Sequence, residues 1–241
     1  MISKTALVFG GTRGIGAAIV EALAADGFDV AFTYTSAAPD ALPAAGSGQK
    51  ITAHKADIRN PEEIAAVIDA VKAGHDGPLT CVVANAGINV PPSPVGQFPD
   101  DRFRDLVEVN IVGAFNVLRA AAQNVADGGT IIGLTTSMVR VAIPGVGPYT
   151  ATKAAVESLL RSMSKELAGR GVRVNGVAPG PVDTDLFRAG KDEAAIQRSA
   201  GLSPFGRVGE PAEVAAVVAF LASDKASWVH GQIVQPNGGL V

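Results

Sequence analysis

Short apolar runs alternate with longer stretches of helical pattern along the whole chain. Continuous apolar runs of this kind are typical of parallel strands that are covered on both faces. The runs span residues 5–10, 29–34, 50–57, 79–87, 129–136, 172–180 and 232–238. Between them, the pattern predicts helices over residues 15–26, 61–73, 100–126, 149–169 and 210–222.

This alternation of strands and helices predicts an α/β fold. We expect a Rossmann-type, doubly wound parallel sheet of about seven strands with helices on both faces. No linker, composition break or internal repeat divides the chain, so residues 1–241 are expected to form a single domain. Residues 185–209 are polar, punctuated by glycine and too long for an ordinary connection, and we predict a substrate lid there.

Composition and charge exclude several other classes of protein. The formal net charge is -3 and the Lys and Arg residues are scattered, which argues against a nucleic-acid partner. No apolar stretch is long enough to span a bilayer, and a glycine loop at residue 10 leaves no room for a signal peptide. We therefore expect a soluble, cytoplasmic protein without a membrane partner.

Cysteine and histidine offer little material for a metal site. The single cysteine, Cys81, excludes an internal disulfide and lies in an apolar run, where a buried strand residue is expected. His54, His75 and His230 have no ligand-like spacing with each other or with Cys81. We predict no metal ion.

A cluster of glycines separates the first predicted strand from the first predicted helix. Gly10, Gly11, Gly14 and Gly16 lie in the stretch "VFGGTRGIGAAIVEAL". At this place in a βαβ unit, glycines let the backbone approach a dinucleotide pyrophosphate, which binds the N–H groups at the positive end of the helix. The spacing G-x-x-x-G-x-G differs from the more common G-x-G-x-x-G, but the context predicts nucleotide binding.

Tyr149 and Lys153 are four residues apart at the start of a predicted helix, so their side chains share one face. A half-buried ring and a solvated charge would account for them without any chemistry. A positive neighbour, however, favours the phenolate and lowers the pKa of a tyrosine from its usual ~10. The pair can therefore act in proton transfer.

Taken together, these motifs resemble the short-chain dehydrogenase/reductase family, and in particular its 3-oxoacyl-acyl-carrier-protein reductases, over nearly the whole chain. The glycine loop is similar to the family's Thr-Gly-x-x-x-Gly-x-Gly, with Gly10 taken as the counterpart of the threonine. Residues 84–87 match its Asn-Asn-Ala-Gly stretch, with Ala84 in place of the first asparagine. Residues 179–184 match its Pro-Gly loop that ends in threonine.

The resemblance implies four catalytic residues: Asn110, Ser137, Tyr149 and Lys153. Tyr149 would be the general acid in reduction and the general base in oxidation, while Lys153 would hydrogen-bond the nicotinamide ribose. Ser137, twelve residues before Tyr149, would polarise the substrate carbonyl, and Asn110 would hold a water of the proton relay. Without the resemblance, Ser137 would be a strand-end hydroxyl bonded to the backbone, and Asn110 a mid-helix residue that does the same.

The end of the second predicted strand decides the expected cofactor. An NAD enzyme places Asp or Glu there, about 20 residues past the glycines, to bind the ribose 2′-OH. Here the strand ends in Tyr34, Thr35 and Ser36, with no acid until Asp40. Their hydroxyl and N–H groups, together with Arg13, suit a 2′-phosphate, although Arg13 is also compatible with a solvated loop residue. NADP(H) is therefore preferred over NAD(H).

The other expected cofactor contacts follow from the resemblance. Asp57 would contact the adenine amino group, residues 85–87 the adenosine ribose, and Thr184 the nicotinamide amide. The full set of expected cofactor-binding residues is Gly10, Thr12, Arg13, Gly14, Ile15, Gly16, Tyr34, Thr35, Ser36, Asp57, Ile58, Asn85, Ala86, Gly87, Tyr149, Lys153, Pro179, Gly180, Val182 and Thr184.

The expected function is NADP(H)-dependent reduction of a ketone, either a 3-oxoacyl or a small carbonyl compound, to a secondary alcohol. An NAD-dependent alcohol or sugar dehydrogenase and a nucleotide sensor without turnover are the alternatives. Val90, Val139, Ile143 and Phe187 are expected to line an apolar substrate pocket, and Arg140 to be solvated. The resemblance also implies a homotetramer, with a dimer as second choice, formed through the helices over 100–126 and 149–169 and the C-terminal segment.

Overall fold

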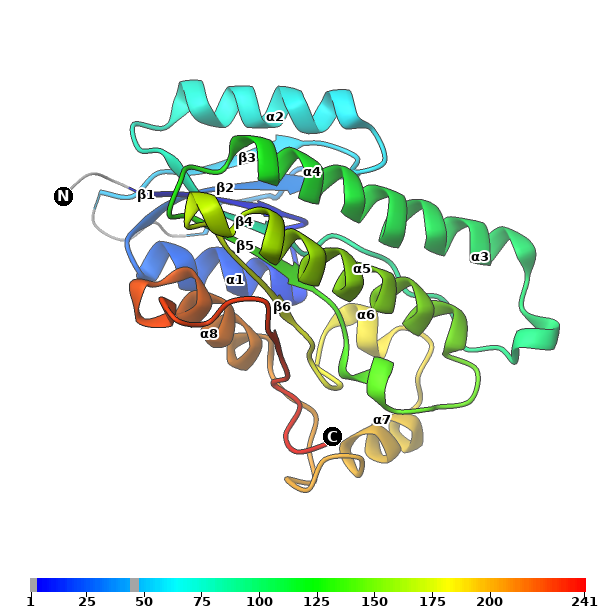
Figure 1. Ribbon diagram of the computed structural model, residues 1–241. Helices are drawn as coiled ribbons and strands as arrows, with labels where there is room; N and C mark the ends of the chain where they lie inside the picture. The colour runs from blue at the N-terminus through cyan, green and yellow to red at the C-terminus, as the bar shows by residue number, and fades with distance from the viewer. Residues whose placement is uncertain (1–3, 44–47) are drawn as a thin grey trace.

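Seven parallel strands form one sheet in the computed structural model, which describes residues 4–43 and 48–241. The strands are β1 (Lys4–Phe9), β2 (Phe28–Tyr34), β3 (Ile51–Lys55), β4 (Leu79–Ala84), β5 (Thr130–Leu134), β6 (Arg173–Val177) and β7 (Ile233–Val234). Their order across the sheet is β3-β2-β1-β4-β5-β6-β7. The chain starts in the middle of the sheet, winds to one edge and then winds to the other (Figure 1). The predicted doubly wound fold is confirmed.

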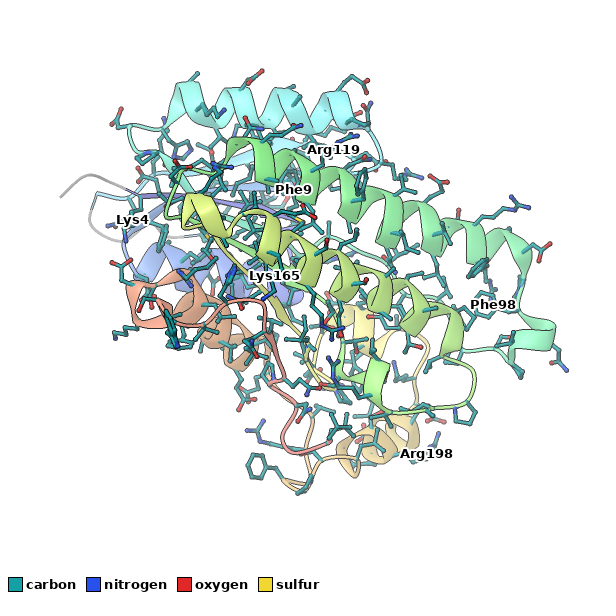
Figure 2. All side chains as sticks on the ribbon, viewed as in Figure 1. Lys4, Phe9, Phe98, Arg119, Lys165 and Arg198 are labelled. Atoms are coloured by element: carbon teal, nitrogen blue, oxygen red, sulfur yellow. The ribbon has the colours of Figure 1, made fainter. Side chains whose placement is uncertain are left out.

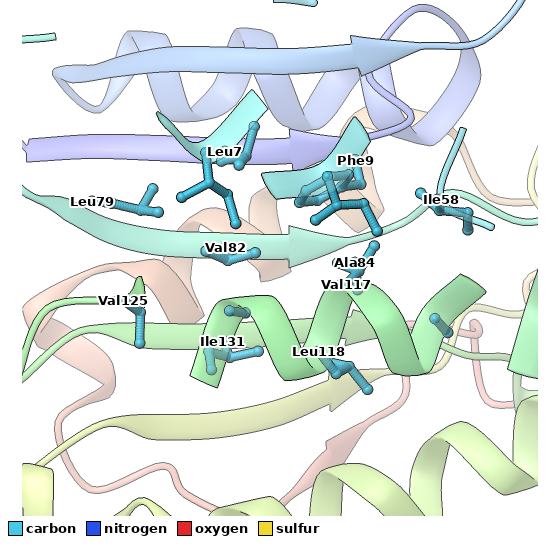
Figure 3. Close-up of a cluster of buried hydrophobic side chains, with 14 of the residues drawn as sticks. Leu7, Phe9, Ile58, Leu79, Val82, Ala84, Val117, Leu118, Val125 and Ile131 are labelled. Carbon is cyan, nitrogen blue, oxygen red and sulfur yellow. The ribbon is translucent and has the colours of Figure 1, made fainter. Parts of the chain in front are cut away.

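Helices cover both faces of the sheet (Figure 1). The first face carries α2 (Pro61–Gly74), α4 (Ala114–Asn124) and α5 (Gly147–Glu166), and the second carries α1 (Gly14–Ala25) and α8 (Pro211–Ala222). Continuous apolar strands supply side chains to both layers, as Leu7 and Phe9 do on the first face and Ala6 and Val8 on the second. Figure 3 shows the first of these cores, with Leu7 and Phe9 on the sheet and Leu118 on α4, which packs on the same face.

Local signals in the sequence mark several helix ends. Asn60 caps α2 by accepting hydrogen bonds from the backbone N–H groups of Glu62 and Glu63, and Pro61 occupies the first helical position.

Cys81 is fully buried in β4, as expected, and burial raises the pKa of its thiol to about 12. Side chains surround the whole ribbon, with Phe9 in the sheet layer and Arg198 on the small helix near the C-terminus (Figure 2).

The helix predicted over residues 100–126 is not one regular helix. It consists of α3 (Asp100–Val107), a π-helical turn η2 (Glu108–Gly113) and α4. A π-helical turn holds one more residue than an α-helical turn, so it changes which residues face the core, and it occurs frequently at functional sites. Asn110 lies in this turn and is 1% exposed. Periodicity alone predicted the helix and missed the change of register.

Residues 185–209 contain two short helices, α6 (Asp185–Arg188) and α7 (Glu193–Ala200). A bridge between Val182 and Gly209 joins the two ends of this segment, so it leaves the sheet and returns at one point. The predicted role of this segment as a substrate lid stays a prediction.

The remaining elements are short 3-10 turns: η1 (Val95–Gln97), η3 (Ser137–Arg140), η4 (Ala168–Arg170) and η5 (Asp224–Ala226). No helix within the described residues has the length and apolar character needed to cross a membrane.

Candidate active site

A cleft of about 570 Å³ opens at the carboxyl ends of β1 to β4, where the winding direction of the sheet reverses. Parallel α/β sheets bind ligands at this type of switch point. The predicted residues in its wall are Gly10, Thr12, Arg13, Gly14, Ile15, Gly16, Tyr34, Thr35, Asp57, Ile58, Asn85, Ala86, Gly87 and Thr184. Its other wall residues are Thr33, Ala56, Arg59, Ile88, Asn89, Asp105, Val109, Asp185 and Leu186.

The glycine loop is built so that larger residues do not fit. A Cβ on Gly16 would lie 1.9 Å from the carbonyl oxygen of Gly10, which also accepts a hydrogen bond of 2.7 Å from the Asn85 amide. The N–H of Gly10 donates to the Thr33 hydroxyl at 3.0 Å. The first turn of α1, which the structure describes in full, contains no acidic residue, so its positive end is open to an anion. The loop therefore fits a pyrophosphate.

The position of Gly10 within the glycine loop differs from the prediction. Gly10 has a φ of +82°, and a Cβ on it would lie 2.9 Å from the Cα of Ala86. A threonine does not fit this position, so Gly10 is the first glycine of the G-x-x-x-G-x-G loop and not the counterpart of the family's threonine. Phe9, which precedes it, stands at that position and is fully buried.

The end of the cleft beside β2 and β3 carries two arginines. Arg13 is exposed at the start of α1, and Tyr34 and Thr35 lie in the same wall, whereas Ser36 does not line the cleft. Arg59, which we did not predict, forms an ion pair of 2.5 Å with Asp57. This side-chain hydrogen bond holds the pKa of the Asp57 carboxyl below its usual range. Arg59 has no motif around it, and only its position two residues after Asp57 points to the site.

The Pro-Gly loop after β6 contributes less to the cleft wall than expected. Of its predicted residues, Thr184 lines the cleft, whereas Pro179, Gly180 and Val182 do not. Val182 is 6% exposed and packs in the core on the α1 and α8 face. Gly180 packs closely against the backbone of Asn237.

Lys153 is buried on α5 and reaches the end of β5. Its ammonium group donates to the carbonyl oxygen of Leu134 at 3.1 Å, and a Cβ on the cleft residue Gly87 would lie 3.2 Å from it. Burial lowers the pKa of Lys153 to about 8. Lys153 is not among the residues that line the cleft, but its ammonium group is adjacent to the cleft wall at Gly87.

Tyr149 is half-buried one turn earlier on the same helix. Burial raises the pKa of its phenol to about 12, and a hydrogen bond with the Thr136 hydroxyl acts in the opposite direction. We predicted a value lowered by Lys153. Desolvation is the dominant effect, and the direction of the pKa shift is the reverse of the predicted one.

The hydroxyl beside Tyr149 belongs to Thr136 and not to Ser137. Ser137 is fully buried, donates to the carbonyl oxygen of Ala178 at 2.6 Å and accepts from the Asn237 amide at 3.0 Å. Both partners belong to the loops that follow β6 and β7. The predicted role of Ser137 in polarising the substrate carbonyl stays a prediction, and Thr136, thirteen residues before Tyr149, is a second candidate for that role.

Asn110 holds the chain that follows β4. Its side-chain amide donates to the carbonyl oxygen of Ile88 at 2.9 Å and accepts from the N–H of Ile88 at 2.8 Å. It also donates to the Thr152 hydroxyl at 3.2 Å. The side chain thus fixes the cleft wall next to Gly87 and Lys153, and its predicted role in a water relay stays a prediction.

The comparisons with known proteins agree with this geometry. Residues 10–241 match a family model described as enoyl-(acyl carrier protein) reductase. A short-chain type dehydrogenase/reductase of Picea abies is 41% identical over 99% of this chain and 92% of its own length. The chain belongs to the short-chain dehydrogenase/reductase family. As a member of this family, it is an oxidoreductase enzyme.

Two further relatives of this short-chain dehydrogenase/reductase carry cofactor information. An NADPH-dependent aldehyde reductase-like protein, chloroplastic, of Arabidopsis thaliana is 38% identical over all of this chain and 95% of its own. The structure of a short chain dehydrogenase of Burkholderia cenocepacia in complex with NADP superposes with a TM-score of 0.90. It is 33% identical and covers 99% of this chain and 98% of its own.

Two polar clusters of this short-chain dehydrogenase/reductase lie outside the predicted site. Arg140, expected to be solvated, forms a pair of 2.8 Å hydrogen bonds with Glu157. His54 and His75, which are far apart in sequence, both contact the Thr52 hydroxyl, at 3.0 and 3.1 Å. Within residues 4–43 and 48–241, no three His, Cys, Asp or Glu side chains come together as metal ligands.

Proposed function

We propose that this protein is an NADP(H)-dependent reductase that converts a ketone, either a 3-oxoacyl or a small carbonyl compound, to a secondary alcohol. One observation carries the proposal. The phenol of Tyr149 is hydrogen-bonded to the Thr136 hydroxyl just after β5, and the ammonium group of Lys153, one turn further along α5, binds the Leu134 carbonyl oxygen next to the cleft wall at Gly87. This set of groups suits a carbonyl oxygen that gains a proton.

Each group has a distinct part in the reaction. NADPH, bound along the glycine loop, supplies the hydride. Tyr149 is protonated at neutral pH and donates its proton to the carbonyl oxygen. Thr136 donates a hydrogen bond to the same oxygen and stabilises the negative charge that develops on it. Lys153 stays mostly protonated below about pH 8 and provides the nearby positive charge.

The preference for NADP(H) rests on the end of β2. Tyr34 and Thr35 line the cleft there in place of an acidic residue, and Arg13 is exposed next to them. A guanidinium group binds a phosphate through two parallel hydrogen bonds, whereas a carboxylate at this position would repel it. The NADP complex of the Burkholderia relative and the NADPH-dependent Arabidopsis relative support this preference.

The substrate is expected to enter on the side of α6 and α7. Val90, Val139, Ile143 and Phe187, predicted as pocket walls, are all partly buried. An apolar acyl or aryl group next to the reacting carbonyl suits such a wall. A homotetramer in the cytoplasm remains our expectation for the assembly and its location.

The test is a cofactor-oxidation assay with a panel of 3-oxoacyl esters, small ketones and aldehydes, run with NADPH and with NADH. We expect turnover with a higher kcat/KM for NADPH. Arg13→Ala is expected to reduce the NADPH-to-NADH ratio by about tenfold or more, because it removes a charge-assisted contact. A wild-type preference for NADH would overturn the cofactor assignment, and binding of NADPH without turnover of any carbonyl compound would overturn the reductase assignment.

A further inference from the structure

A buried carboxylate lies on α5 directly below the proposed catalytic pair. Glu157 follows Lys153 by one helical turn and Tyr149 by two, on the same face of the helix. It is 2% exposed. Its two oxygens accept hydrogen bonds from Arg140 Nη1 and Nη2, both at 2.8 Å, and from Thr135 and Arg161, both at 3.2 Å.

Two of these donors bracket Thr136. Thr135 immediately precedes it, and Arg140 ends the 3-10 turn η3 that follows it. The neighbouring backbone is held in the same way, since the carbonyl oxygen of Leu134 accepts from Lys153. Three successive residues at the end of β5 thus contact three turns of α5: Leu134 with Lys153, Thr135 with Glu157 and Thr136 with Tyr149.

An ion pair with a buried carboxylate is a costly way to hold two segments together. Removing the charge of Glu157 from water costs several kcal/mol unless the geometry is close to ideal, although the Arg140 side chain stays 27% exposed, and apolar residues of similar volume often serve equally well for stability. The paired Nη–Oε hydrogen bonds supply what apolar contacts do not, which is a fixed distance and orientation. The pair therefore suits a segment whose position matters for chemistry.

We infer that Glu157 and Arg140 are positioning residues for the reductase reaction, which hold the Thr136 hydroxyl in register with Tyr149 and Lys153. This inference rests on the proposed function. Arg161 provides the contrast, because it binds the same carboxylate from the same helix at i+4 and so does not connect α5 to residues 135–140.

The kinetic test compares Glu157→Gln with Arg161→Ala. The glutamine amide places an N–H donor opposite one of the two donors of Arg140 and removes the negative charge, so the paired hydrogen bonds to Arg140 are lost. We expect kcat to fall by about tenfold or more, since displacement of a reacting group by ~1 Å costs up to ~100-fold. The KM for NADPH is expected to stay within about twofold, because the glycine loop is untouched, and Arg161→Ala is expected to retain wild-type kcat.

A double-variant cycle then distinguishes positioning from general destabilisation. If Glu157 acts through Thr136, adding Glu157→Gln to Thr136→Ala reduces kcat by less than about twofold further. If the fold-loss in kcat of the double variant equals the product of the two single-variant losses, the inference is overturned. So would an equal effect of Arg161→Ala. Arg140→Lys, which keeps the charge and loses the second of the two parallel hydrogen bonds, tests the same link if Glu157→Gln does not fold.

Hydrogen exchange gives a readout that needs no turnover. The backbone N–H groups of Ser137, Val139 and Val141 are hydrogen-bonded within or next to η3. We expect them to exchange faster in Glu157→Gln and Arg140→Lys than in wild type and Arg161→Ala. Unchanged exchange in these variants would overturn the inference. If the wild-type protein reduces no carbonyl compound, the proposed function fails, while the exchange data still decide whether Glu157 and Arg140 hold this segment.

Discussion

At the scale of single residues, Thr136 and Ser137 carry the same functional group in different surroundings. The Thr136 hydroxyl is hydrogen-bonded to Tyr149, whereas the Ser137 hydroxyl is bonded to Ala178 and Asn237. A hydroxyl that faces the reacting oxygen affects the rate, and one that is buried and satisfied affects stability.

Alanine at each position separates these two effects. Thr136→Ala is expected to reduce kcat by ~10²–10³-fold with a small change in stability, as for loss of one donor to a developing oxyanion. Ser137→Ala is expected to cost about 1–3 kcal/mol of the free energy of unfolding, because it leaves the Asn237 amide without its buried acceptor. Steady-state kinetics and urea unfolding of both variants check this. A large loss of kcat in Ser137→Ala and not in Thr136→Ala would identify Ser137 as the residue that polarises the substrate carbonyl.

The pKa directions of Tyr149 and Lys153 predict the pH dependence. The phenol, with its pKa raised to about 12, stays protonated across the working range, so its titration does not limit reduction. Lys153, with its pKa lowered to about 8, carries its charge below that value and loses it above. We expect kcat/KM for reduction to be level up to about pH 8 and to fall above it, and alcohol oxidation to rise with pH as more phenolate forms. A reduction rate that rises between pH 8 and 10 would contradict these assignments.

At the scale of elements, the glycine loop between β1 and α1 depends on close backbone contacts. A Cβ on Gly16 would meet both the Gly10 carbonyl oxygen and the Asn85 amide, whereas one on Gly169 would meet nothing within 4 Å. Gly16→Ala is therefore expected to abolish the increase in Tm on addition of NADPH, and Gly169→Ala to retain it. Tight NADPH binding by Gly16→Ala would show that the loop is not the pyrophosphate site.

The sequence predicted these elements better than it predicted the site. Apolar runs located all seven strands because a strand covered on both faces needs apolar side chains at every position. The π-helical turn around Asn110 has no periodic signature, so one helix was predicted in place of three segments. Thr136 and Ser137 both carry a hydroxyl group, and the sequence does not show which of the two hydroxyls lies beside Tyr149. Glu157 is paired with Arg140, which lies seventeen residues away in the sequence, and no motif marks that pair.

At the scale of the whole molecule, large apolar side chains are exposed at several places, and two of these places belong to segments expected at subunit interfaces. Phe103 and Phe115 are 45% and 43% exposed along α3 and α4, and Trp228, after η5, is 97% exposed. Two such patches on different elements suit the two kinds of twofold interface that a tetramer has, and the tetramer stays our expectation.

Charged substitutions in the two patches test this assembly. We expect light scattering at micromolar concentration to give four chain masses for wild type and two for either Phe115→Glu or Trp228→Glu. Combining both substitutions is expected to give a monomer. A monomeric wild-type protein would contradict the tetramer, and an unchanged mass for Trp228→Glu would remove that residue from the interface.

The central claim is that Tyr149 donates the proton in NADPH-dependent carbonyl reduction, and one measurement tests it most directly. The rate of NADPH oxidation by a saturating carbonyl substrate is compared between wild type and Tyr149→Phe, with NADPH binding followed separately by the change in Tm. Phenylalanine keeps the ring and its packing and removes the transferable proton. We predict unchanged NADPH binding and a rate lower by ~10²–10⁴-fold, the usual contribution of general acid catalysis. A variant that binds NADPH normally and keeps more than about a tenth of the wild-type rate would contradict the account.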